Sequence, residues 1–177
     1  GTLSYDMAAY GWLMVAGGMN IFGSGETASG KTTLLNSIST FIDPDGKVVS
    51  IEDTPELQIP HENWTREVVR GSAVGESAVS MFDLLRSALR QRPDEILIGE
   101  IRGEEGAVVF QAMQTGHPCM ATFHASTVEK LIQRLTGQPI NIPKPYIDNL
   151  NMVILMSAVR LPDGRTARRV TSINEII

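Results

Sequence analysis

The sequence predicts an α/β domain with a mostly parallel sheet, helices on both faces of that sheet and an antiparallel hairpin at its C-terminal end. Short apolar runs typical of buried strands alternate with segments of helical periodicity along most of the chain. A glycine-rich loop separates the first of these strands from the next helix, and a Pro-Asp-Gly turn separates the last two strands. The 177 residues are enough for one such domain, so we expect a single domain over 1–177.

The first part of the chain begins with a helix over 4–16 and a short, largely apolar strand over 19–22. After the glycine-rich loop, residues 33–38 continue with helical spacing. The Asp-Pro-Asp-Gly turn at 43–46 then leads into an apolar strand over 47–51.

The middle of the chain is less regular. Residues 57–76 contain a proline and two glycines, so we expect a long excursion or an added hairpin there, with a short strand near 65–70. Residues 80–90 carry apolar side chains at helical spacing, and this helix should end before Pro93. Residues 95–100 are apolar until a final carboxylate, which predicts a buried strand.

The last part of the chain continues the alternation of strand and helix, which indicates a mostly parallel sheet. The remaining expected elements are a helix over 104–114, a strand over 119–123, a helix over 127–135, and strands over 151–160 and 165–173 that flank the turn at 161–164.

Residues 25–32 match the pattern G-x-x-x-x-G-K-[ST], whose spacing is set by the phosphates of a nucleotide. Glycine at both ends lets the backbone curl around an anion, so that N–H groups and the N-terminus of the next helix point at it. Lys31 adds a positive charge, and the Thr32 hydroxyl is the expected Mg²⁺ ligand. The candidate nucleotide-binding residues are Gly25, Glu26, Thr27, Ala28, Ser29, Gly30, Lys31, Thr32 and Thr33.

Acidic side chains and a histidine follow three of the expected strands, at the sheet edge where the glycine-rich loop also lies. They are Glu52 and Asp53, Glu100, and His124. A water molecule that attacks a γ-phosphate must be positioned and partly deprotonated. Glu100 is the first choice for this task, because it directly follows the apolar run 96–98 and Gly99. The alternative is that Glu100 caps the following helix.

Glu52 and Glu56 are competing candidates for the catalytic base or for the water shell of Mg²⁺, and the sequence does not rank them. Asp53 and Glu56 have a second interpretation, in which they cap a turn around Pro55. His124 would sense the γ-phosphate by donating a hydrogen bond, or it would be a buried histidine bonded to the backbone.

Three arginines are further candidates. Arg102 would stabilise phosphate charge within its own chain or reach a neighbouring chain, and Arg66 and Arg70 would act across an interface. A surface ion pair is the alternative for each of them.

The net charge of −5 and the pI near 5.2 argue against a broad, nonspecific grip on nucleic acid, so we expect no nucleic-acid partner. Cys119 is the only cysteine, which permits no internal disulfide and fits a reducing compartment. Its spacing from His117 and His124 matches no standard zinc cluster. The chain has no apolar run long enough to span a bilayer.

Four ordered motifs together resemble the Walker A, Asp box, Walker B and His box of the secretion ATPase superfamily, which powers type II and type IV secretion, type IV pili and archaella. They are GETASGKTT at 25–33, IEDTPEL at 51–57, IGEIRG at 98–103, and TGH at 115–117 with TFHA at 122–125. The paired CxxC motif of many bacterial members is absent, and the resemblance is strongest to the archaeal branch.

The resemblance implies a RecA-like P-loop NTPase domain that hydrolyses ATP with Mg²⁺ and works in a hexameric ring. It also implies that a smaller N-terminal domain precedes this one in the full protein and helps to hold the nucleotide, so this fragment would hydrolyse ATP weakly by itself. The ring would push a membrane platform protein from the cytoplasm, at the inner face of the cell membrane. The alternatives are a RecA-like nucleic-acid-dependent ATPase and a nucleotide-binding assembly module without turnover.

Overall fold

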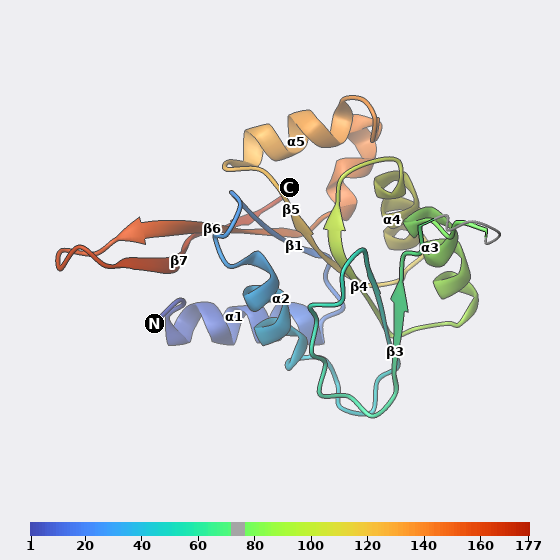
Figure 1. Ribbon diagram of the computed structural model, residues 1–177, viewed down its shortest axis with the longest axis horizontal. Helices are drawn as coiled ribbons and strands as arrows, with labels where there is room; N and C mark the ends of the chain where they lie inside the picture. The colour runs from blue at the N-terminus through green and yellow to red at the C-terminus, as the bar shows by residue number, and fades with distance from the viewer. Residues whose placement is uncertain (72–76) are drawn as a thin grey trace.

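A computed structural model describes residues 1–71 and 77–177, and the strands of these residues form one seven-stranded sheet (Figure 1). Across the sheet their order is β3-β2-β4-β5-β1-β6-β7. Neighbours from β3 to β6 pair in parallel, and β7 pairs antiparallel with β6. The predicted sheet and C-terminal hairpin are therefore confirmed. The strands are β1 (Ile21–Gly25), β2 (Val48–Glu52), β3 (Trp64–Val68), β4 (Glu95–Ile101), β5 (Cys119–Phe123), β6 (Met152–Arg160) and β7 (Thr166–Glu175).

Helices cover both faces of the sheet, as predicted (Figure 1). On one face, α1 and α2 bury apolar side chains such as Val15 and Leu35 against Ile21 of β1. On the other face, α3, α4, α5 and the 3₁₀ helix η1 form a second core around Phe22 and Ile98. The helices are α1 (Tyr5–Ala16), α2 (Lys31–Ser39), α3 (Met81–Arg90), α4 (Glu105–Gln114), α5 (Val128–Thr136) and η1 (Lys144–Asn149). Among the described residues, none of these helices has the length and apolar character needed to cross a membrane.

The segment between β2 and α3 was expected to be a long excursion or an added hairpin, and its described residues contain one strand and one isolated antiparallel bridge. The expected strand near 65–70 is β3 (Trp64–Val68), which pairs in parallel with β2 and forms the edge of the sheet, so β2 and β3 do not form a hairpin. Arg70 and Val79 exchange two backbone hydrogen bonds in an isolated antiparallel bridge, which is the one hairpin-like pairing among the described residues of this segment. The Trp64 indole Nε1 donates a hydrogen bond to Ser50 Oγ at 2.8 Å, which ties this edge strand to β2. The rest of the expected excursion, residues 72–76 with Gly75, lies outside the described residues.

Helix α3 begins at a capping box. The Ser80 hydroxyl accepts a hydrogen bond from the Asp83 amide at 3.2 Å, and the Asp83 carboxylate accepts one from the Ser80 amide at 3.2 Å. Two backbone donors at the start of the helix are thereby satisfied, which explains why the helix starts at Met81.

Candidate active site

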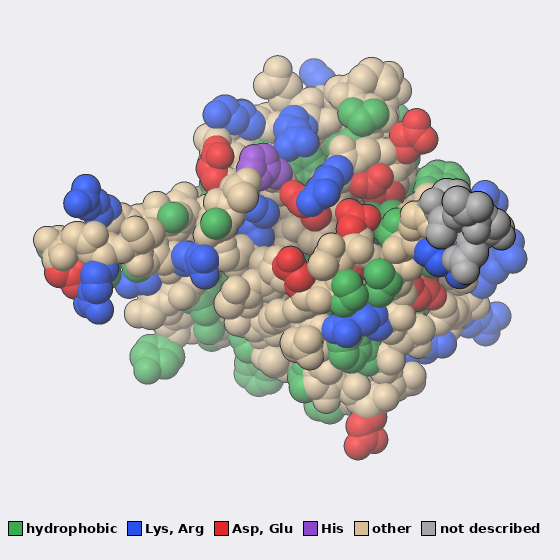
Figure 2. Space-filling view, in the orientation of Figure 1, with side chains coloured by type: hydrophobic (Ala, Val, Ile, Leu, Met, Phe, Trp, Pro, Cys, Tyr) green, Lys and Arg blue, Asp and Glu red, His purple; other side chains and the backbone are tan. Residues whose placement is uncertain are grey.

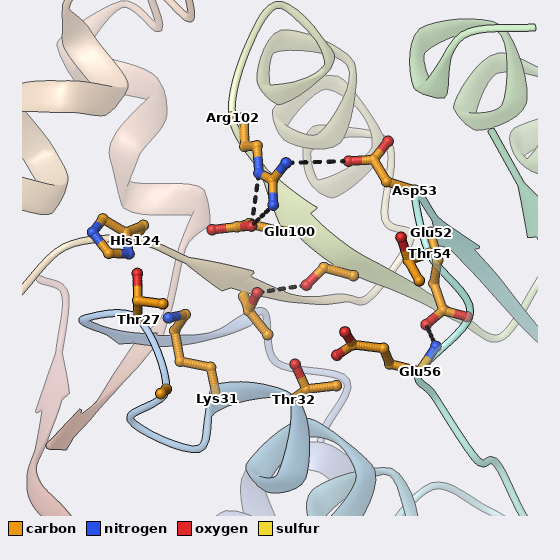
Figure 3. A pocket seen from close by; sticks show the side chains of 13 residues that line it. Thr27, Lys31, Thr32, Glu52, Asp53, Thr54, Glu56, Glu100, Arg102 and His124 are labelled. Carbon is orange, nitrogen blue, oxygen red and sulfur yellow. Dashed lines mark hydrogen bonds and ion pairs between the residues drawn. The ribbon is translucent and has the colours of Figure 1, made fainter. Parts of the chain in front are cut away.

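A cavity of about 330 Å³ lies at the carboxyl edge of the sheet, between the glycine-rich loop and the ends of β2, β4 and β5. Figure 3 shows that side chains from these four segments face a common space, and Figure 2 shows acidic side chains gathered near the middle of the same face. The expected convergence of the strand ends with the loop is therefore present. The lining residues are Thr27, Ala28, Lys31, Thr32, Glu52, Asp53, Thr54, Glu56, Gly99, Glu100, Arg102, Thr122 and His124.

The glycine-rich loop leaves β1 at Gly25 and enters α2 at Lys31. Two of its residues adopt left-handed backbone, Ala28 at φ 60° and Gly30 at φ 97°, and this curls the loop back on itself. The Lys31 ammonium donates hydrogen bonds to the carbonyls of Gly25 at 2.9 Å and Glu26 at 2.8 Å. Burial lowers the pKa of Lys31, while the negative charges of Glu100 and Glu26 oppose that shift. The loop thus has the strand, turn and helix setting that a phosphate-binding loop requires.

Glu52 at the end of β2 is a buried carboxylate, only 1% exposed. Its Oε1 accepts hydrogen bonds from the amides of Glu56 and Leu57, both at 2.8 Å, and its Oε2 lies 3.5 Å from Arg66 Nε. The turn around Pro55 is therefore closed by Glu52 and not by Asp53 or Glu56. One oxygen of the Glu52 carboxylate is occupied by this turn, whereas the carboxylate of Glu56 is exposed at the cavity and more accessible to a ligand.

Glu100 near the end of β4 projects into the cavity with 23% of its side chain exposed. Arg102 binds the Glu100 Oε2 twice, through Nε at 2.7 Å and through Nη2, and its Nη1 lies 3.8 Å from Asp53 Oδ2. These contacts raise the pKa of the Arg102 guanidinium. Arg102 thus forms ion pairs within its own chain, as one interpretation of the sequence predicts. Figure 3 shows the Arg102 side chain between the carboxylates of Glu100 and Asp53.

Glu100 does not cap helix α4, which was the alternative interpretation of this residue. Glu105 holds the segment before α4, because its Oε1 accepts hydrogen bonds from the amides of Arg102 at 2.6 Å and Gly103 at 2.8 Å. The hydrogen bonds of Glu100 in the described structure go to the Arg102 side chain. Its carboxylate therefore belongs to the cavity and not to the helix N-terminus.

Gly99 directly precedes Glu100 on β4, and its neighbours explain why this residue is small. A Cβ atom at Gly99 would lie 3.3 Å from Glu52 Cγ, closer than most side-chain contacts. The Gly99 carbonyl accepts a hydrogen bond from the Thr122 hydroxyl, which also lines the cavity. Thr122 was not among the candidate residues, although it stands two positions before His124 in the same motif.

His124 follows β5 and lines the cavity together with Thr27 and Lys31 (Figure 3). Its backbone position is fixed from two sides. Ser24 Oγ donates to the Ala125 carbonyl at 2.7 Å, and Arg134 donates to the His124 carbonyl. The imidazole is half-buried and faces the cavity, which disagrees with a histidine enclosed in the core.

The other candidates lie elsewhere. Arg66 donates to the Leu57 carbonyl and stacks 4.5 Å above the Trp64 ring, so it holds the segment between β2 and β3. Arg70 follows β3, pairs through its backbone with Val79 and donates from its side chain to the Ser77 carbonyl at 3.4 Å. Cys119 is buried at the opposite end of β5 from His124, so these two side chains do not share a metal site.

Comparisons of the sequence with known proteins identify the family of this chain. The sequence profile of the type II/IV secretion system protein family matches residues 2–161. An uncharacterised protein of Methanocaldococcus jannaschii is 56% identical over 176 residues, which are 99% of this chain and 32% of that protein. This chain therefore spans about a third of the length of that curated relative.

Solved structures show the same fold. The VirB11 ATPase of the Brucella suis type IV secretion system, crystallised with sulphate, superimposes with a TM-score of 0.80 at 26% identity, over 96% of this chain and 52% of that one. The pilus retraction motor PilT with bound ADP gives 0.66 at 28% identity, over 85% and 46%. The fold is therefore RecA-like, and the chain belongs to the archaeal branch of the type II/IV secretion ATPase superfamily.

Proposed function

We propose that residues 1–177 form one RecA-like domain that binds and hydrolyses ATP in a ring-forming motor for protein secretion or for assembly of type IV pilus-like or archaellum-like filaments. One observation carries the proposal: the glycine-rich loop and the carboxylates of β2 and β4 line the same cavity. The family and the two ATPase structures support the general kind of chemistry. The ring and the filament are our own extension of that support.

The phosphates of ATP would bind at the glycine-rich loop from Gly25 to Thr33, with Lys31 exchanging loop carbonyls for phosphate oxygens. The residues also fit Mg²⁺, which prefers oxygen ligands, because the Thr32 hydroxyl and the Glu56 carboxylate both line the cavity (Figure 3). Thr32 would be the direct ligand, with Glu56 in the surrounding water shell. Bound Mg²⁺ would supply positive charge to the β- and γ-phosphates.

Glu100 would polarise the attacking water, since it is the accessible carboxylate at the end of β4. Its pairing with Arg102 leaves this carboxylate engaged before ATP arrives. A γ-phosphate would draw Arg102 away and release Glu100, so Arg102 would stabilise phosphate charge at the same moment. Glu52 would hold the Pro55 turn in place. Glu56 would be the more accessible of these two carboxylates for the water shell of Mg²⁺.

His124 would donate a hydrogen bond to the γ-phosphate, because its side chain lines the same cavity as Thr27 and Lys31 of the glycine-rich loop (Figure 3). The cavity as described carries the groups for phosphates and metal, and we propose that an upstream domain completes the nucleotide site. We also propose a hexameric ring that engages a membrane platform protein from the cytoplasmic side of the membrane, without a nucleic-acid partner.

The test is ATP turnover per chain with Mg²⁺ over a wide range of protein concentrations. We expect turnover to rise with concentration, because a neighbouring chain in the ring would also contribute to the site. Lys31→Ala should abolish binding of a fluorescent ATP analogue, whereas Lys130→Ala, which changes an exposed lysine on α5, should leave it unchanged. A substantial rate that does not depend on concentration would overturn the ring, and nucleotide binding that survives Lys31→Ala would overturn the site.

A further inference from the structure

The C-terminal hairpin lies against the glycine-rich loop, although the two are far apart in the sequence. The hairpin extends from the sheet beside β1 (Figure 1), and β6 pairs with β1 so that Met156 is opposite Gly25. On β7, Arg168 Nε donates a hydrogen bond to the Ala28 carbonyl at 2.9 Å, across 140 positions of sequence. A side chain of the hairpin therefore holds the backbone of the loop at its turn.

Both glycines of the loop motif are packed against this hairpin. A Cβ atom at Gly25 would lie 2.3 Å from the Met156 carbonyl oxygen, and one at Gly30 would lie 3.0 Å from Arg168 Cδ. The aliphatic part of Arg168 thus crosses directly over Gly30, while its guanidinium reaches Ala28. These are separate observations, one of packing and one of hydrogen bonding, and they place the same side chain on the loop.

The Ala28 carbonyl belongs to the peptide group that also contains the Ser29 N–H. That N–H donates to the Glu26 carbonyl at 3.3 Å, inside the loop, while the Ala28 carbonyl points out towards Arg168. Lys31 engages the carbonyls of Gly25 and Glu26. Arg168 therefore engages a loop carbonyl that Lys31 does not reach, from outside the cavity.

We propose that Arg168 is a positioning residue that fixes the glycine-rich loop in its phosphate-binding shape. Ala28 is a left-handed, non-glycine residue, a conformation that persists only where surrounding groups hold it. The Arg168 hydrogen bond supplies that support and orients the Ala28–Ser29 peptide. The inference rests on the proposed nucleotide-binding function and names a residue outside the motif on which that function depends.

The test compares dissociation constants of ATP, ADP and inorganic tripolyphosphate, each with Mg²⁺, for the full chain and its variants. For Arg168→Ala we expect the dissociation constants of all three ligands to increase about fivefold, which is the effect of one lost hydrogen bond. The three increases should be equal, because a phosphate-binding loop contacts phosphates that all three ligands carry. Arg168→Lys should restore part of the affinity, because its ammonium can still donate to the Ala28 carbonyl.

Arg165→Ala is the matched control, since it removes the same charge from the same hairpin at its exposed end, where Arg165 pairs with Asp163. This variant should keep the affinity of the unsubstituted chain. Thermal unfolding without ligand completes the design: a lower unfolding temperature for Arg168→Ala with unchanged dissociation constants would indicate a merely structural role and overturn the proposal.

Four further outcomes would also overturn it. A loss limited to ATP and ADP would mean that Arg168 contacts the nucleoside, and a loss limited to ATP and tripolyphosphate would mean that it contacts the terminal phosphate. Failure of the unsubstituted chain to bind any of the three ligands would remove the proposed function, and this inference with it. Normal binding by that chain, with no change in Arg168→Ala, would remove this inference alone.

Discussion

The two ends of β4 carry glutamates in opposite surroundings. Glu95 at the start of the strand is 3% exposed, and its Oε1 has no hydrogen-bond partner among the described residues. Desolvation raises the pKa of Glu95 well above its ordinary value. Glu100, five positions later, faces a cavity and pairs with Arg102. Burial thus disfavours the ionised form of Glu95 at the amino edge, whereas Glu100 at the carboxyl edge has a cationic partner in Arg102.

The difference shows why the carboxyl edge of this sheet can carry chemistry. The amino edge is closed by short contacts, such as the Lys47 amide that donates to Asp94 Oδ2 at 2.7 Å, and Glu95 is sealed beneath it. At the carboxyl edge the loops diverge around a cavity, so a carboxylate there can reach a ligand and exchange partners. Substitution of Glu95, which is buried without a partner, should therefore affect folding stability, whereas substitution of Glu100, which faces the cavity, should affect ATP turnover.

The largest expected effect is on turnover at the carboxyl edge. Glu100→Gln keeps the shape of the side chain and removes its basicity, so we expect ATP turnover to fall by about 100-fold or more while nucleotide affinity stays within about threefold. Phosphate release and the binding of a fluorescent ATP analogue measure the two quantities. Glu104→Gln, at an exposed glutamate four positions away, is the control and should keep full turnover. Full turnover in Glu100→Gln would remove Glu100 from the mechanism.

Glu52 tests whether a buried carboxylate with partners stabilises the fold. Glu52→Ala removes the acceptor of two backbone amides and the neighbour of Arg66, so we expect the free energy of unfolding at pH 7 to fall by about 2 kcal/mol. Urea unfolding measures this change. The exposed Glu62 lies in the same connection, and Glu62→Ala should change stability by less than about 0.5 kcal/mol. Equal stability of Glu52→Ala and the unsubstituted chain would mean that the Pro55 turn does not depend on Glu52.

The convergence of the candidate side chains at one cavity could be predicted from the sequence, because its parts are local patterns. The glycine-rich loop and the acids after apolar strands are each readable within a few residues, and the ends of parallel strands meet at one edge. The bounds of the first strand differ from the prediction, because the sequence predicts a strand over 19–22 and β1 spans Ile21–Gly25. Its two glycines have low strand propensity, but all five of its residues are buried between β5 and β6, and this packing decides the assignment.

What could not be predicted depends on distant contacts. The hold of Arg168 on Ala28 spans 140 positions, and no local pattern marks it. The parallel pairing of β3 with β2, to which the Trp64 bond to Ser50 adds, joins strands on either side of the β2–β3 connection. The assignment of the turn around Pro55 to Glu52 required knowing which acidic side chain folds back under the loop, because three candidates stand within five residues.

Glu95 provides the opposite test from Glu52. Its pKa is raised in the folded chain, so the folded state holds its proton at a pH where the unfolded state has lost it. Folding stability should therefore decrease as pH rises from the ordinary glutamate pKa, about 4.3, towards the raised value. Glu95→Gln removes this titration, so its unfolding temperature relative to the unsubstituted chain should rise from pH 5 to pH 8. A difference that is constant over this range would show that Glu95 titrates normally.

The smallest effect on stability is expected for Asp83, whose exposed carboxylate only caps the start of α3. The hydrogen bonds from the Ser80 hydroxyl and amide lower the pKa of Asp83 at the start of α3. The stabilisation is then complete above the ordinary aspartate pKa, about 3.9, and is lost as pH falls through the lowered value, the reverse of Glu95. Asp83→Asn should lower the unfolding temperature slightly at pH 7, and this loss should shrink towards pH 3. If the loss were the same at both pH values, the charge of Asp83 would be irrelevant, and its contribution would be only the geometry of the capping box.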